Sequence, residues 1–216
     1  VPAMMLRFVA YIITHSYFKI EIHGQEKLPL KSGALLVANH FSLMDPFLVV
    51  AAAPRMLRFV MDRKIYEYPL WNWLMKRLNM IPVGGRLDAA EREEFNKVCQ
   101  QEVNSNHVLC IFPEGQISRI GHLLEFKKGI EHIAKGIEVP IIPIMIKGER
   151  GTLLSFDIGS SKPVINWFKS FRRKITIEIG DPVAATSKAP ELRQKMQILN
   201  AKAFKRRIRK YHSLPY

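Results

Sequence analysis

The chain of 216 residues is 48% hydrophobic, which excludes global disorder and allows a sizeable core. Its 33 Lys and Arg against 19 Asp and Glu give a formal charge of +14, which attracts nucleic acid, anionic lipid or a phosphorylated substrate. No run of 18 apolar residues is present, so no segment plainly spans a bilayer.

The N-terminal stretch Ala3–Ile13 is apolar apart from Arg7. It predicts a helix that either lies in the headgroup region of a membrane or packs on the core as an ordinary amphipathic helix. The sequence begins with Val1 and not with Met, so we expect a piece of a longer polypeptide. It shows no signal-peptide pattern with a small-residue cleavage site.

Short apolar or alternating runs, bounded by turn residues, predict strands. They are Ala34–Ala38, Leu57–Met61, Val108–Phe112, Ile141–Ile146 and Lys174–Ile179.

Helical spacing of apolar residues occurs between and after these strands. It predicts helices over Asp88–Val103, Phe126–Ile137 and Leu192–Ala203, and Asp88 is suited to be the N-cap of the first. The alternation predicts an α/β layered fold, with a central mixed, largely parallel sheet flanked by helices. We expect a single domain over 1–216, with the possible interfacial helix at 1–20 and a basic helix at 188–216.

The two cysteines, Cys99 and Cys110, lie in helical or apolar surroundings, which predicts buried free thiols. Neither has a histidine at a spacing typical of zinc sites, so no metal is expected.

A polar segment follows the first predicted strand, with Asn39, His40 and, five residues on, Asp45. An acid at this spacing can hold one ring nitrogen of His40 while the other accepts a proton, as general-base catalysis requires. Taken alone, the pair is better explained as a loop histidine and a helix-capping acid, and a second motif is needed to favour catalysis. A second turn, Phe112-Pro113-Glu114-Gly115, follows another strand, and Gly115 would allow a ligand close to the backbone.

Together these motifs resemble the glycerolipid acyltransferase family, which includes the 1-acylglycerol-3-phosphate acyltransferases. Further blocks match in order: Ile81-Pro82-Val83 with Arg86, Phe126-Lys127-Lys128-Gly129, and Val139–Ile144. The similarity covers roughly Ile20 to Asp181. The same stretch of sequence also resembles the acyltransferase module that some bacteria fuse to acyl-activating domains.

The resemblance implies an O-acyltransferase that moves a fatty acyl group from acyl-CoA or acyl-carrier protein to a lysophospholipid hydroxyl, without metal or other cofactor. It assigns His40 as the base, Asp45 as its support, and Arg86, Glu114 and Gly115 to the acceptor's glycerophosphate. An arginine suits phosphate because its planar fork pairs with two oxygens. Glu114 would instead accept a hydroxyl proton or organise the turn.

One difference between this sequence and the family pattern bears on the identity of the acceptor. Many family members continue Glu-Gly with Thr-Arg, whereas Gln116 and Ile117 stand here. The acceptor is therefore expected to be of the lysophosphatidic acid type or, with less charge on its phosphate, of the lysophosphatidylethanolamine type.

Basic residues and aromatics predict a membrane-associated protein, at the cytoplasmic face of the inner membrane, whose partners are membrane lipids and the acyl donor. The alternative left by charge is a nucleic-acid- or anionic-membrane-binding module without catalysis. No reading helix or aromatic platform in a basic field supports nucleic acid as a partner. A serine hydrolase is disfavoured because no Gly-x-Ser-x-Gly elbow is present.

Overall fold

The computed structural model describes residues 2–85, 87–152, 154–156, 163 and 171–212. Its strands are β1 (Lys19–His23), β2 (Ala34–Ala38), β3 (Leu57–Asp62), β4 (Ile81–Val83), β5 (Val108–Ile111), β6 (Ile141–Lys147) and β7 (Lys174–Ile179). Its helices are α1 (Pro2–Tyr17), α2 (Asp45–Ala52), α3 (Arg63–Tyr66), α4 (Pro69–Arg77), α5 (Ala89–Asn104), α6 (Gly129–Ala134) and α8 (Ala189–His212), with a 3-10 turn η1 (Gln25–Lys27).

One mixed sheet of seven strands organises the molecule, in the order β1-β7-β6-β2-β5-β3-β4. Five neighbouring strands of this order, β6, β2, β5, β3 and β4, run parallel to one another. Strand β7 pairs antiparallel with β6, and β1 pairs parallel with β7. The carboxyl ends of β2, β5 and β6 therefore meet at one edge, where parallel sheets commonly bind ligands. The predicted mixed, largely parallel α/β fold is confirmed.

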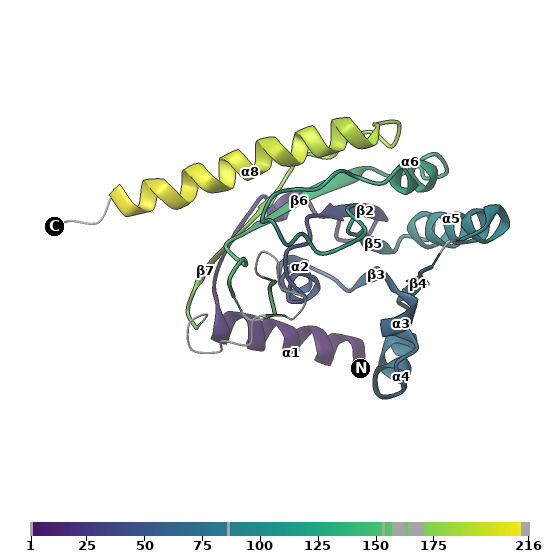
Figure 1. Cartoon of the computed structure of the whole chain (residues 1–216), viewed down its shortest axis with the longest axis horizontal. Coiled ribbons are helices and arrows are strands. Elements are labelled where there is room, and N and C mark those ends of the chain that lie inside the picture. Colours follow the sequence, from purple (N-terminus) through teal and green to yellow (C-terminus); the bar gives the residue numbers. More distant parts are fainter. Residues whose placement is uncertain (1, 86, 153, 157–162, 164–170, 213–216) are drawn as a thin grey trace.

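Helices cover both faces of the sheet (Figure 1). Leu36 of β2 and Ile144 of β6 pack on the side of α1 and α2, whereas Leu35 and Met145 pack against α5, α6 and α8. Successive residues of a strand point to opposite faces, so both faces of a central strand are buried and its sequence is continuously apolar. This explains why Ala34–Ala38 shows no alternation and is fully buried.

The five predicted strands are all confirmed, with ends that differ by one residue at most. The edge strands β1 and β4 were not predicted, because β1 is only partly buried and β4 has three residues. The helix expected over Phe126–Ile137 is shorter and begins at Gly129. The helix after Asp88 is confirmed, with a capping box in which the Asp88 and Glu91 side chains accept each other's backbone amide hydrogens.

Helix α1 has several apolar side chains exposed on its outer surface, while two of its polar side chains face the protein. Thr14 is fully buried, and Arg7 donates to the carbonyl oxygen of Ala53 at 2.7 Å, which caps the end of α2. The exposed apolar side chains are Met5, Phe8, Val9, Tyr11, Ile12 and Ile13. A group of exposed apolar side chains of this kind is typical of a surface that contacts a membrane or another protein.

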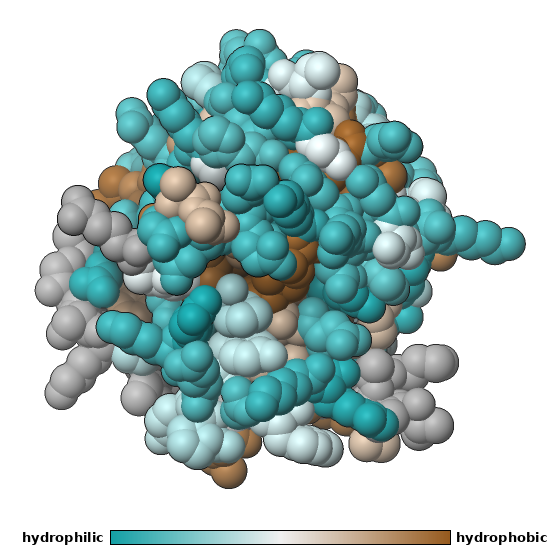
Figure 2. Space-filling model, turned by 90° about the vertical axis from the view of Figure 1, so that its right-hand side faces the viewer, coloured by the Kyte–Doolittle hydropathy of each residue, from teal (hydrophilic) through white to brown (hydrophobic). Residues whose placement is uncertain are grey.

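The cysteines are confirmed as buried free thiols, and burial raises the pKa of Cys99 to about 12 and that of Cys110 further. Hydrophilic residues cover most of the end of the molecule shown in Figure 2, with an apolar patch exposed in a hollow near its centre. Within the described part of the chain, no helix is long and apolar enough to cross a membrane.

Candidate active site

The loop after β2 is fixed to the neighbouring strand by Asn39. The Asn39 amide nitrogen donates to the Ile146 carbonyl oxygen at 3.1 Å, and its carbonyl oxygen accepts from the Ile146 amide at 2.7 Å. The side chain thus continues the β2–β6 pairing one residue beyond the last Cα partners, Ala38 and Ile144. Because Asn39 is fully buried, the following residue leaves the sheet from a rigid base.

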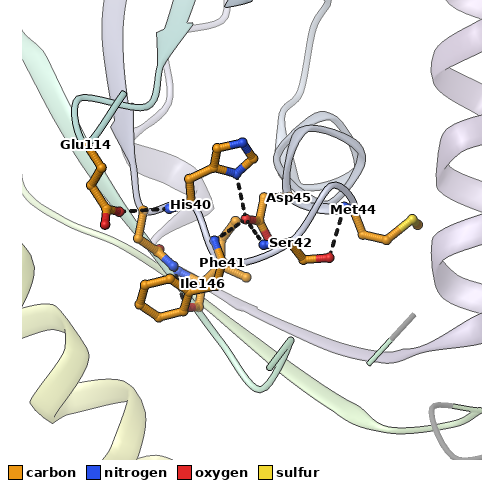
Figure 3. Close-up of polar contacts among 8 residues, drawn as sticks. His40, Phe41, Ser42, Met44, Asp45, Glu114 and Ile146 are labelled. Carbon is orange, nitrogen blue, oxygen red and sulfur yellow. Dashed lines mark hydrogen bonds and ion pairs between the residues drawn. The ribbon is translucent and has the colours of Figure 1, made fainter. Parts of the chain in front are cut away.

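His40 and Asp45 form the pair that the sequence predicts (Figure 3). The His40 Nδ1 lies 3.0 Å from Asp45 Oδ2, and the same oxygen accepts from the Phe41 amide at 2.7 Å and the Ser42 amide at 2.8 Å. Three donors converge on one carboxylate oxygen, so Nδ1 carries the hydrogen and Nε2 is left with its lone pair. The His40 side chain is 16% exposed and Asp45 is fully buried.

The Asp45 carboxyl group is subject to opposing influences. Burial raises its pKa above the ordinary value, while the hydrogen bonds and charge of His40 and the amides of Ser42 and Phe41 lower it. A protonated His40 would be the strongest of the stabilising partners, because it adds an opposite charge in direct contact. Burial is the largest of these influences, so the net effect is a raised pKa of Asp45.

Phe112 fixes the plane of the imidazole. Its ring stacks on His40 with centroids 4.1 Å apart and an interplanar angle of 19°, and its other neighbour is Phe59, at 6.2 Å. The sequence placed Phe112 at the end of a predicted strand and in a turn motif, without predicting its contact with His40. An aromatic residue at the end of a strand adjacent to β2 was the available signal, but the pairing of β2 with β5 had to be known to use it.

Glu114 joins three loops from a buried position. Its Oε1 accepts from the His40 amide at 2.9 Å, and its Oε2 accepts from the Leu124 amide at 2.8 Å. The residue is 2% exposed, and burial raises the pKa of its carboxyl group. Both oxygens are engaged by backbone amides, which supports the turn-organising role; contact of Glu114 with the acceptor remains a prediction.

Gly115 lies at the exposed tip of the same turn, with φ of +66°, a conformation that favours glycine. The loop then returns to the base, because the Ser118 amide donates to the His40 carbonyl oxygen at 2.8 Å. Arg86, the third residue expected at the acceptor site, lies outside the described residues.

A buried acid beside the pair was not predicted. Glu149 follows β6 and is 1% exposed, and neither carboxylate oxygen has a hydrogen-bond partner among the described residues. Burial, and then the charge of Asp45, raise its pKa well above the ordinary value, which favours the neutral carboxyl group. A single Glu in a Gly- and Arg-containing loop gave no signal of burial.

In the described ranges, no group of three or more His, Cys, Asp or Glu side chains is arranged to hold a metal ion. A pocket of about 310 Å³ is lined by Arg55, Leu57, Arg58 and His107, among others. It lies at the amino ends of β3 and β5, the opposite edge of the sheet from His40, and so takes no part in this site.

Comparison with known proteins decides the family. The family model described as Acyltransferase matches residues 19–147, a range that contains His40, Asp45, Glu114 and Gly115. This chain belongs to the Acyltransferase family.

Relatives of this acyltransferase-family chain include a 1-acyl-sn-glycerol-3-phosphate acyltransferase of Cocos nucifera, 36% identical over 115 residues, which are 53% of this chain and 37% of that protein. Another with the same name, from Helicobacter pylori strain J99, is 28% identical over 182 residues, 83% of this chain and 70% of the relative. The chain spans 37 to 40% of the length of the first three plant relatives.

The crystal structure of the 1-acyl-sn-glycerophosphate (LPA) acyltransferase PlsC from Thermotoga maritima has a similar fold. The TM-score is 0.67 at 24% sequence identity, over 94% of this chain and 78% of that one. The similarity supports the α/β architecture of this family member and the presence of an N-terminal helix.

Proposed function

We propose that this chain is an O-acyltransferase that esterifies the free hydroxyl of 1-acylglycerol 3-phosphate in phospholipid synthesis or repair. The observation that carries the proposal is the His40–Asp45 contact of 3.0 Å at the carboxyl end of the sheet, with Nε2 free to accept a proton. The names of the relatives, which specify this acceptor, support the choice of substrate.

The mechanism needs only the imidazole and its carboxylate. His40 Nε2 takes the proton of the acceptor hydroxyl as its oxygen bonds to the thioester carbonyl carbon of the donor. The carbon–sulfur bond then breaks, and the thiolate receives the proton held on Nε2. Asp45 stabilises the intervening imidazolium and preserves the tautomer, while the Phe112 ring restricts rotation of the imidazole.

A lysophospholipid with a diester head group, such as lysophosphatidylethanolamine, is a second candidate acceptor. It is favoured by Gln116 and Ile117, which stand where the resemblance places Thr-Arg, since a missing cation suits a phosphate of lower charge. Turnover of the two lysolipids in parallel separates the candidates, and a strong preference for lysophosphatidic acid would eliminate the second.

The outward face of α1 is proposed to contact the membrane that supplies the acceptor. Its exposed apolar residues lie across the sheet from α8, whose exposed cations include Lys195 and Lys205 (Figure 1). We propose that the protein lies on the cytoplasmic face of the inner membrane, where acyl-CoA or acyl-carrier protein is available. Both donors are acidic, so a basic surface directed away from the lipid would attract either.

Acyl transfer in mixed micelles, with a panel of lysolipids and both donors, tests the activity. We expect His40→Ala to lower kcat by at least about 100-fold, because general-base catalysis is typically worth about 10² to 10⁴ in rate. His122→Ala is the matched control, since His122 is an exposed histidine outside the pair. Equal loss in both variants, or none in His40→Ala, would refute the mechanism.

Vesicle co-flotation tests the membrane face. The double change Phe8→Ser with Ile12→Ser should weaken binding to anionic vesicles at least about tenfold, because a buried Phe or Ile side chain contributes about 1.5–3 kcal/mol. The same changes at Phe204 and Ile198 of α8, which are comparably exposed, provide the control. If the α8 variant loses vesicle binding and the α1 variant keeps it, α1 is not the docking surface.

A further inference from the structure

The resemblance assigns the turn after β5 to the acceptor's glycerophosphate, but this turn lacks the arginine that many family members have there. Gln116 is exposed and uncharged, and Ile117 is apolar. A phosphate at this turn would still need a cation, because backbone amides alone leave most of its charge uncompensated. The described side chains around Gly115 show which residue is placed to supply it.

Lys127 lies across Gly115. A β-carbon built on Gly115 would be 2.6 Å from the Lys127 Cε and 2.7 Å from its Nζ, so the ammonium group rests directly on the turn. The absence of a side chain at Gly115 is what makes this position possible. Among the described residues Lys127 has no ion pair, and the nearby Glu114 carboxylate is occupied by two backbone amides.

The backbone around Lys127 is held against the same turn. The Lys127 amide donates to the Pro113 carbonyl oxygen at 2.9 Å, and three residues earlier the Leu124 amide donates to Glu114. Arg193 of α8 in turn donates to the carbonyl oxygens of Leu123 and Leu124, at 3.0 and 2.9 Å. These contacts fix the backbone of Lys127 against the turn, while its side chain is exposed.

Two other cationic side chains near the turn, Arg119 and Arg150, contact other residues in place of Gly115. Arg119 lies over the ring of Phe156, with 5.4 Å from its guanidinium carbon to the ring centroid. Arg150 packs against Gly121, six residues beyond the turn tip. Of these three described cations, Lys127 is the one that lies on Gly115.

The turn is also close enough to the base for one small acceptor to reach both. Glu114 binds the His40 amide, and Ser118 binds the His40 carbonyl oxygen, so Gly115 lies between two direct contacts of the catalytic residue. In 1-acylglycerol 3-phosphate the free hydroxyl and the phosphate are on adjacent carbons. A phosphate bound at Gly115 would therefore keep the hydroxyl near the imidazole.

We propose that Lys127 is the acceptor's phosphate-binding cation, which takes the place of the arginine absent at Ile117 and binds the phosphate over Gly115. This inference rests on the proposed acyltransferase function and specifies how its acceptor is recognised. It accounts for retention of a phosphomonoester acceptor in a chain without that arginine. A diester phosphate would meet the same ammonium group but with one negative charge less.

The first experiment compares Lys127→Met, Lys127→Arg and Lys128→Met in acyl transfer. Methionine retains an unbranched stem over Gly115 but lacks the charge, and the exposed Lys128 is the matched control. We expect Lys127→Met to raise the KM for lysophosphatidic acid about 10- to 100-fold, as loss of a charge-assisted hydrogen bond predicts. The KM for the donor should be unchanged, Lys127→Arg should restore most of the affinity, and Lys128→Met should resemble the wild type.

A second experiment separates this inference from the proposed reaction. Binding of sn-glycerol 3-phosphate is measured by calorimetry on the His40→Ala protein, with and without Lys127→Met, so no turnover is required. Weaker binding with Lys127→Met supports the phosphate site even if no acyl transfer is found. Unchanged binding, or a lower kcat with unchanged acceptor KM, overturns it even if the enzyme is active.

Discussion

Replacing Asp45 by asparagine removes the negative charge beside His40 and leaves most of the local structure in place. The asparagine carbonyl oxygen can still accept from His40 Nδ1 and from the amides of Phe41 and Ser42. What is lost is the attraction between a carboxylate and the imidazolium that forms during the reaction.

The size of this loss follows from the contact distance. At an effective dielectric constant of about 20, opposite unit charges 3.0 Å apart attract by about 5.5 kcal/mol. A neutral hydrogen bond retains about 1 kcal/mol, which leaves a deficit of about 4.5 kcal/mol. His40 is partly exposed, so water reduces that figure. We expect kcat to fall about 10²- to 10³-fold.

The assay is kcat for acyl transfer at saturating lysophosphatidic acid, with the melting temperature measured on the same preparations. Asp45→Asn should melt close to the wild type, because burial of the carboxylate is itself unfavourable. Asp45→Ala should be less stable, since it leaves two buried amides without their acceptor, at about 1–3 kcal/mol each. A folded Asp45→Asn protein with more than about a tenth of wild-type kcat would refute the electrostatic role.

Three further predictions concern the residues around the pair. Phe112→Leu removes the ring stacked on His40 and should lower kcat about 2- to 10-fold in the same assay, with an unchanged melting temperature if the ring acts only on the imidazole. Glu114→Gln can satisfy only one of the amides of His40 and Leu124, so differential scanning fluorimetry should show a loss of several degrees; an unchanged value would argue against the tethering role. Burial raises the pKa of Glu149, so the folded protein binds a proton that the unfolded chain releases above about pH 4.5, and stability falls as pH rises from there toward the folded-state pKa. Glu149→Gln should therefore melt several degrees higher than the wild type at about pH 8 and similarly at about pH 4; parallel melting curves at both would contradict this.

The sequence by itself determined the central strands and the α/β class, and its motifs predicted that His40 and Asp45 form a pair. Continuous apolar runs such as Ile141–Ile146 report burial on both faces of a sheet. The spacing of five residues allows the Asp45 carboxylate to reach one ring nitrogen of His40, and this local contact was predictable once the resemblance to the family favoured the pair. The capping box at Asp88 was predictable for the same reason, since its partners are three residues apart.

Tertiary structure alone decided which distant residues support the base. Phe112 and Glu114 reach His40 because β2 and β5 are neighbours, which no local periodicity encodes. Lys127 acquires a role only because Gly115 lies beneath it, and the burial of Glu149 depends on the elements packed around the end of β6. Local sequence restricts backbone conformation and the polarity of each face, whereas charge, burial and hydrogen-bond partners are set by segments that meet only after the sheet has formed.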